Sequence, residues 1–264
     1  MVEVMTHQWN PKQYEKFEKE RNQPFFDLIQ LIHPMHHPRI IDLGCGNGSL
    51  TRILHDKFHA SYILGIDTSK DMLAQAHSMQ TPHLIFKEQD IRTLTSTAPF
   101  NLVISNAAIQ WIPDHPVLLK RLTDLLAPGG QLAIQMPANQ NYPTHLIAAE
   151  LASEEPFKQA FKQETDPLHH LLSLEEYALL FDQLGFESQV VRLQLYVHFL
   201  ESTASVMEWV KGSLLTYYKS YLEPDLYVMF LKEYQKRLIE RLGWSEPFFY
   251  RMKRLFLWGQ LPLN

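Results

Sequence analysis

Short apolar runs alternate along most of the chain with longer stretches in which apolar residues lie three or four positions apart. The short runs predict strands over about residues 39–43, 62–67, 83–87, 100–105, 131–136, 186–199 and 254–258. The stretches between them predict helices over about residues 48–58, 69–79 and 117–126, the second capped by Ser69. This alternation predicts an α/β fold with right-handed βαβ units, a doubly wound, mostly parallel sheet, and helices on both faces.

Two longer helical stretches flank this alternation. Residues 9–32 show an apolar face, and two prolines interrupt the chain before the first predicted strand. Residues 202–241 also follow a helical pattern, in which Pro224 is expected to begin a new helix. We expect the two stretches to form an α-helical cap. A Pro-Gly-Gly sequence at 128–130 is expected to end the helix at 117–126.

Composition and charge narrow the functional classes. The chain has 264 residues, of which 45% are hydrophobic and 20% charged, so it can bury a substantial core. Its formal net charge of −5 and its pI of about 6.2 argue against nucleic acid as a partner. No run of about eighteen apolar residues and no signal-like apolar stretch occurs, which argues against a membrane partner. We therefore expect a soluble, cytoplasmic protein.

Glycines follow the first predicted strand at a regular spacing. Asp42 ends the strand, Gly44, Gly46 and Gly48 follow at alternating positions, and Leu50 opens a helical pattern. Glycine lets the backbone adopt a positive φ, and its missing Cβ lets a ligand come close. This strand, glycine turn and helix N-terminus indicate a binding loop. The alternative is a purely structural tight turn that binds no ligand.

A second acidic residue supports a nucleoside ligand. Asp67 ends the second predicted strand, nineteen residues after Gly48, where a carboxylate is placed to hydrogen-bond ribose hydroxyls. The dinucleotide fingerprint G-x-G-x-x-G/A is not met, because Ser49 occupies its sixth position. The pattern D-x-G-x-G-x-G resembles motif I of the S-adenosylmethionine (SAM) methyltransferases, so we expect SAM as the cofactor.

The resemblance extends over nearly the whole chain. The sequence resembles the SAM-dependent carboxyl methyltransferases, and most of all the trans-aconitate 2-methyltransferases. The matching segments lie within residues 8–21, 42–48, 65–69, 90–92, 106–115, 135–145 and 254–256. Malonyl-carrier-protein methyltransferases of biotin synthesis and insect juvenile-hormone acid methyltransferases are similar around Gln110 and Trp111. Since all of these esterify carboxylates, the resemblance implies a small carboxylic acid as substrate.

The resemblance also implies roles, position by position. The cofactor set comprises Asp42, Gly44, Cys45, Gly46, Gly48, Asp67, Thr68, Met72, Asp90, Ile91, Asn106 and Ala107. Within that set, the glycine loop would hold the methionine end, Asp67 the ribose, and Asp90 with Ile91 the adenine. The catalytic set, which would close the site near the transferring methyl group, comprises Tyr14, Gln110 and Trp111. The substrate set comprises Arg21, His145, Tyr234 and Arg254.

The expected chemistry needs positioning groups rather than a base. A carboxylic acid with a pKa of about 4 is already ionised at neutral pH, so it can attack a sulfonium methyl group directly. Proximity and orientation would then supply most of the rate. Cys45 is the only cysteine, and we interpret it as a small packing residue rather than a nucleophile. No metal site is expected, because prolines interrupt the histidines at 33–37.

These expectations give a domain plan. Residues 1–37 would be an N-terminal helical cap segment, and residues 38–200 the SAM-binding α/β core. Residues 201–251 would be a helical cap insertion, and residues 252–264 a final strand that returns to the core.

Several alternatives stay open. Trp111 could be a core residue, and Gln110 could cap a local loop. The enzyme could instead methylate a carboxyl group on an acidic carrier protein, docked against a helix that carries most of the seven basic residues between Lys232 and Arg254. A protein of another class would bind SAM without turnover, as a sensor or scaffold.

One position bears on the choice of acid. In the trans-aconitate methyltransferases, an arginine follows a Trp-Val pair in the cap, and the corresponding position here is Thr216. A guanidinium binds a carboxylate in a bidentate manner and threonine does not. We therefore expect a substrate that is less charged or more apolar than trans-aconitate.

Overall fold

The computed structural model describes residues 18–161, 166–168 and 170–263. Its chain forms two compact units. The first, here called the sheet unit, contains Asn22–Ala138, His170–Gln194 and Arg254–Asn264. The second, here called the helical unit, contains Asn139–His169 and Leu195–Lys253. The segment 139–169 thus groups with the helices, whereas the domain plan from the sequence placed it in the α/β core.

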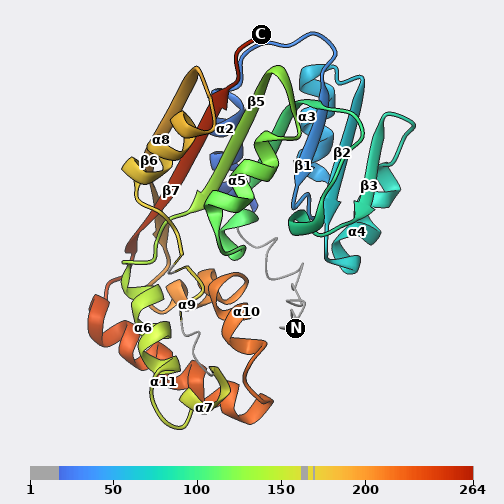
Figure 1. Cartoon of the computed structure of the whole chain (residues 1–264). Helices are drawn as coiled ribbons and strands as arrows, with labels where there is room; N and C mark the ends of the chain where they lie inside the picture. The colour runs from blue at the N-terminus through green and yellow to red at the C-terminus, as the bar shows by residue number, and fades with distance from the viewer. Residues whose placement is uncertain (1–17, 162–165, 169, 264) are drawn as a thin grey trace. The chain divides into compact units, whose positions relative to one another are not determined.

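A seven-stranded sheet organises the chain, in the order β3-β2-β1-β4-β5-β7-β6 (Figure 1). The strands are β1 (Arg39–Leu43), β2 (Tyr62–Asp67), β3 (Leu84–Glu88), β4 (Phe100–Asn106), β5 (Leu126–Pro137), β6 (Ser188–Leu200) and β7 (Phe248–Gln260). The first five pair in parallel, and β7 runs antiparallel to β5. The expected α/β class and mostly parallel sheet are therefore confirmed. The strand order reverses between β1 and β4, which is where ligands bind in such sheets.

Helices and short 3-10 turns connect the strands of the sheet unit. They are α2 (Glu18–Ile29), α3 (Ser49–Phe58), α4 (Lys70–Ala76), α5 (His115–Thr123) and α8 (Leu174–Gln183), with η1 (His77–Met79), η2 (Ile91–Thr93) and η3 (Ile109–Trp111). Buried residues of β1, β4 and β5 form one cluster with side chains of α5 and α8. Central strands buried on both faces read as continuous apolar runs, which explains why the sequence predicts them well.

The helical unit contains α6 (Pro143–Ala152), α7 (Lys158–Phe161), α9 (Ser205–Lys211), α10 (Leu214–Lys219) and α11 (Pro224–Leu242). Aromatic rings form much of its interior: Phe230 stacks on Tyr218 at 5.2 Å and on Tyr234 at 6.4 Å between ring centroids. The Tyr234 hydroxyl donates to the Thr144 carbonyl at 3.1 Å, which ties α11 to α6. Pro224 begins α11, as the sequence indicates.

The structure differs from the sequence-based elements at three places. Residues 128–130 do not precede the fifth strand but lie inside β5, and α5 ends earlier, at Thr123. The stretch is accommodated by a register shift opposite Phe100 and Leu102, and the Gly129 N–H donates to the Pro262 carbonyl at 2.7 Å. The helices α6, α7 and α8 were not predicted, and the helix at 9–32 is described only as Glu18–Ile29.

Candidate functional site

The glycine loop after β1 is held by backbone hydrogen bonds. The N–H groups of Gly44 and Cys45 both donate to the Ile66 carbonyl at the end of β2, at 2.8 and 2.9 Å. Gly44 has a φ of +76°, and a Cβ there would lie 2.2 Å from the Cβ of Ala108. Only glycine meets both conditions. The close approach also places the residues after β4 directly against the loop.

Asp67 joins the glycine loop to the start of α4. Its Oδ2 accepts the Gly46 N–H at 2.9 Å, and its Oδ1 accepts the Ser69 N–H at 2.8 Å. The carboxylate is half-buried, and each oxygen keeps a further lone pair for another donor. Gly46 has a φ of +55°, and a Cβ there would meet no atom within 4 Å. The loop is therefore rigid beneath Asp67 and open above Gly46, a shape that fits a nucleoside ligand.

Asp42 lies beneath this loop rather than on its surface. Its side chain is 4% exposed, and its Oδ2 accepts the Thr51 hydroxyl at 2.6 Å. Burial raises the pKa of Asp42 to about 6, the Thr51 hydrogen bond opposes this, and the Asp67 charge adds to it. Burial likewise raises the pKa of the Cys45 thiol, which therefore stays protonated. Asp42 anchors β1 to α3, and Cys45 has the properties of a packing residue.

The acidic residue after β3 is engaged by its neighbour. Asp90 accepts the Arg92 backbone N–H at 2.8 Å and its guanidinium Nε at 3.0 Å. These hydrogen bonds hold the pKa of Asp90 below its ordinary value. Ile91 is half-buried beside it, Met72 is half-buried on α4, and Thr68 is exposed. A contact from Asp90 to an adenine amino group would thus share the carboxylate with Arg92.

The residues after β4 form a strained, buried turn. Ala107 has a φ of +55°, which is costly for a residue with a Cβ and typical of functional sites. Its N–H donates to the Gln135 carbonyl on β5 at 2.8 Å, and its carbonyl accepts Nε2 of Gln110 at 2.8 Å. Gln110 is 2% exposed, and Trp111 is half-buried. The turn is fixed from both sides.

Three amide atoms near this turn are buried and lack a hydrogen-bond partner among the described residues: Asn106 Oδ1, Gln110 Oε1 and Gln135 Nε2. Buried polar atoms are nearly always hydrogen-bonded in proteins, so each needs an explanation. A bound ligand supplies one. Sequence reasoning proposed Asn106 and Gln110 but missed Gln135, whose only signal was a polar residue within the apolar run of the fifth strand.

A buried histidine supports the turn from behind. His115 is 1% exposed, its Nε2 lies 3.2 Å from the Ile109 carbonyl, and its Nδ1 lies 2.5 Å from the Tyr177 hydroxyl. Burial lowers the pKa of His115 to about 4. A neutral ring therefore donates from Nε2 to Ile109 and accepts the Tyr177 hydroxyl at Nδ1. This pair could not be predicted from the sequence, because its members are 62 positions apart.

The expected substrate residues belong to different parts of the chain. Tyr14 and the side chain of Arg21 lie outside the described residues. His145 and Tyr234 belong to the helical unit, whereas Arg254 belongs to the sheet unit, where β7 pairs it with Pro137. His145 is buried, its Nδ1 lies 3.0 Å from the Thr144 hydroxyl, and burial lowers its pKa to about 3. His145 is thus a neutral group.

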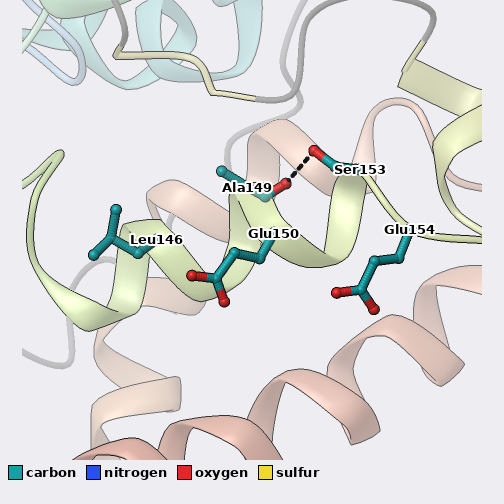
Figure 2. A pocket seen from close by; sticks show the side chains of 5 residues that line it. All are labelled: Leu146, Ala149, Glu150, Ser153 and Glu154. Atoms are coloured by element: carbon teal, nitrogen blue, oxygen red, sulfur yellow. Dashed lines mark hydrogen bonds between the residues drawn. The ribbon is translucent and has the colours of Figure 1, made fainter.

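A surface pocket of 460 Å³ lies on the helical unit, lined by Leu146, Ala149 and Glu150 of α6 and by Ser153 and Glu154, which follow the helix (Figure 2). Its two carboxylates are already paired with α11. Arg241 binds Glu150 through two bonds of 2.8 Å, and Arg237 binds Glu154 through bonds of 2.8 and 2.7 Å. This pocket therefore offers no free group for chemistry, unlike the turn after β4.

Among the described residues, no helix is both long and apolar enough to span a bilayer. No group of three or more His, Cys, Asp or Glu side chains is arranged there to hold a metal ion.

Comparison with known proteins identifies the class of this α/β protein. A family model described as a methyltransferase domain matches residues 14–191. The chain belongs to this methyltransferase family and is a SAM-dependent methyltransferase.

Within that class, the chain is similar to proteins named trans-aconitate 2-methyltransferase. It is 37% identical to that of Deinococcus radiodurans over 257 residues, which cover 96% of this chain and 98% of the relative. It is 35% identical to that of Methylobacterium nodulans, over 88% of this chain and 89% of the relative. The resemblance inferred from the motifs is confirmed.

Solved structures share the fold. The YcgJ protein of Bacillus subtilis matches with a TM-score of 0.61 at 13% identity. The match covers 92% of this chain and 100% of that protein. Phosphoethanolamine N-methyltransferase 2 of Haemonchus contortus, in complex with S-adenosylhomocysteine, matches with a TM-score of 0.55 at 20% identity. That match covers 91% of this chain and 52% of the other. At these identities, the likeness concerns the fold alone.

Proposed function

We propose that the protein transfers the methyl group of SAM to a carboxylate of a small organic acid. The observation that carries this proposal is the character of the turn after β4. Its buried groups are amides, and the titratable group that supports it, His115, is neutral and engaged on both ring nitrogens. The described groups of this turn can position a nucleophile and do not include a free base, which suits a carboxylate. The names of the relatives support the same chemistry.

The expected cofactor contacts fit the sheet unit. The ribose would bind Asp67, whose oxygens keep acceptor capacity beyond Gly46 and Ser69. The methionine end would lie against the glycine loop, where Gly46 leaves room. The unpartnered Oδ1 of Asn106 is an acceptor suited to a cationic group. When bound, SAM supplies an electrophilic methyl group, and the residues of this chain orient it and exclude water.

The choice of acid is proposed from the helical unit. Thr216 lies on α10, half-buried, and its hydroxyl donates to the Ser213 carbonyl. At this position a guanidinium could pair with an extra substrate carboxylate, and the threonine offers no such charge. We propose an acid less charged or more apolar than trans-aconitate, and the expected substrate set of Arg21, His145, Tyr234 and Arg254 stays a prediction.

The carrier-protein alternative finds less support in the structure. It depended on a basic helix that faces an acidic partner. Two arginines of that helix, Arg237 and Arg241, are bound in a bidentate manner by Glu154 and Glu150 of the same unit. Lys236 also lies 4.0 Å from Glu233. Much of the positive charge is thus neutralised within the chain.

A turnover assay with labelled SAM and a panel of acids tests the proposal. The panel should contain tricarboxylates, dicarboxylates, apolar monocarboxylates and a malonyl carrier protein. We expect a base-labile methyl ester on a small acid. Label on the carrier protein alone would support the alternative enzyme. SAM binding with no labelled product from any member of the panel would support the non-catalytic class.

A further inference from the structure

Two glutamines on β5 occupy nearly equal positions but differ in their hydrogen bonds. Gln131 and Gln135 are each 1% exposed and, four residues apart on one strand, face the same side of the sheet. Gln131 is satisfied: its Oε1 accepts the His33 N–H at 2.8 Å and Trp258 Nε1 at 2.9 Å, and its Nε2 donates to the His33 carbonyl at 3.1 Å. Nε2 of Gln135 has no partner among the described residues.

Gln135 lies at the carboxyl end of β5, beside the strained turn. It is paired in register with Asn106 on β4, and its carbonyl accepts the Ala107 N–H at 2.8 Å. The Ala107 carbonyl in turn accepts Nε2 of Gln110. Ala108, the next residue, touches the position that a Cβ of Gly44 would fill. The backbone that carries these three amides is thus linked to the turn beside the glycine loop, at the edge of the sheet where ligands bind.

The unpartnered atoms differ in hydrogen-bonding character. Gln110 is oriented by its bond to Ala107, which leaves its Oε1 as an acceptor, and Asn106 also presents an acceptor. Gln135 presents a donor. Acceptors suit a cation such as a sulfonium or an ammonium group, and a donor suits an anion. A buried amide donor without a partner is unfavourable, so a chain that keeps one gains from it elsewhere.

We propose that Nε2 of Gln135 positions the substrate carboxylate by hydrogen bonding to the oxygen that does not receive the methyl group. This role rests on the proposed function. The other carboxylate oxygen forms the new bond to the methyl carbon while the carbon–sulfur bond breaks. Its electron pair remains on sulfur, no proton is transferred, and a methyl ester and a neutral thioether result. Gln110 Oε1 and Asn106 Oδ1 face the cationic partner of the same reaction.

The two glutamines provide a matched test. Gln135→Met removes an unpartnered donor, so the unfolding midpoint should stay unchanged or rise, and SAM affinity by titration should stay within about twofold. The value of kcat/KM for trans-aconitate, or for the best acid of the panel, should fall by about a hundredfold, as when one positioned donor is lost. Gln131→Met removes three hydrogen bonds, so its midpoint should fall while kcat/KM is retained.

The variant Gln135→Glu tests whether the N–H donor, rather than the volume of the side chain, is what Gln135 contributes. The carboxylate has nearly the same volume but no N–H, and only its protonated form can donate. Activity of this variant should be low at neutral pH and recover as the pH falls, and the wild type should not follow that profile. The variant also covers the case in which Gln135→Met does not fold.

The proposal is overturned if Gln135→Met keeps its kcat/KM and loses stability as Gln131→Met does, because Gln135 is then structural. It is also overturned if Gln135→Glu follows the pH profile of the wild type. A wild type that binds SAM and methylates no acid contradicts the proposed function itself, and the role of Gln135 with it. The experiments therefore distinguish failure of the role proposed for Gln135 from failure of the proposed function.

Discussion

The two halves of the candidate site differ in whether their polar side chains are hydrogen-bonded within the chain. After β1, β2 and β3, the chain satisfies each acidic side chain itself: Asp42 through Thr51, Asp67 through Gly46 and Ser69, and Asp90 through Arg92. At the carboxyl ends of β4 and β5 and in the turn after β4, one amide atom each of Asn106, Gln110 and Gln135 has no partner among the described residues. We call the first group the loop half and the second the amide half.

The difference has a physical meaning. A hydrogen-bonded loop keeps its shape before a ligand binds, which favours tight binding of one cofactor. Unpartnered buried amides lower stability but are available to a ligand and discriminate by charge. We infer that the loop half is built for the cofactor and the amide half for orienting the reacting groups.

The largest expected effect would break the loop half. In Gly44→Ala, the new Cβ would meet Ala108 and the backbone would be strained at a φ of +76°. The free energy of unfolding should fall by about 3 kcal/mol, measured by urea denaturation. Ala108→Gly added to this variant should restore part of the loss. Gly46→Ala, whose Cβ meets no atom, should lose only about 1 kcal/mol. Equal losses in the two variants would contradict the contact with Ala108.

The support behind the amide half should depend on pH. Burial lowers the pKa of His115 to about 4 from its ordinary 6.5. Between these pH values, the histidine is protonated in the unfolded chain and neutral in the folded protein. Stability from this group is present above pH 6.5 and is lost as the pH falls towards 4, by at most about 3 kcal/mol. His115→Gln should lose that pH dependence, measured as the free energy of unfolding between pH 7 and 4.5.

The comparison with His115→Gln is needed because Asp42 acts in the opposite direction. Burial raises the pKa of Asp42 to about 6, so its contribution is present below about pH 3.8 and is lost as the pH rises through 6. The difference between the wild type and the variant removes this shared term. Parallel pH profiles of the two proteins would mean that His115 is exposed to solvent.

A smaller effect should appear in cofactor affinity. Asp67→Ala removes the acceptor expected for the ribose and two bonds to backbone N–H groups. SAM binding should weaken by about 1.5–3 kcal/mol in a titration. Gln135→Met, in the amide half, is the matched variant and should bind SAM as the wild type does. Unchanged SAM affinity in Asp67→Ala would remove Asp67 from the cofactor site.

The sequence predicted the loop half far better than the amide half, for physical reasons. Apolar runs that end in Asp42 and Asp67 are visible locally, and the glycine spacing between them reports a backbone conformation. Whether a buried glutamine is satisfied depends on partners far along the chain, such as His33 and Trp258 for Gln131. Sequence alone therefore did not separate Gln131 from Gln135.

The helices and strands were likewise predicted best where the signal lies in the local sequence. The strands of the parallel core were predicted closely because both of their faces are buried, and the start of α3 because Gly48 precedes it. The helix α8 was missed, although its capping box of Ser173 and Glu176 is a local signal. The end of α5 was placed late because the Pro-Gly-Gly stretch lies within a bulged strand.

The smallest expected effect lies outside both halves, in the helical unit. Thr216→Arg would place a guanidinium on α10 in place of a hydroxyl that bonds to the Ser213 carbonyl. Activity on tricarboxylates should rise by about fivefold, on the scale of one partly exposed ion pair. Thr216→Gln, which has length without charge, is the control. Efficient turnover of trans-aconitate by the wild type would contradict the predicted preference for a less charged acid.

The central claim is that the enzyme positions an already ionised carboxylate and removes no proton. The pH dependence of kcat with saturating SAM and the best acid of the panel tests it most directly. We predict a rate that stays within about twofold from pH 6 to 9, because the carboxylate titrates near pH 4. A rate that climbs about tenfold per pH unit through neutrality would show that a proton must leave the nucleophile, and would contradict the account.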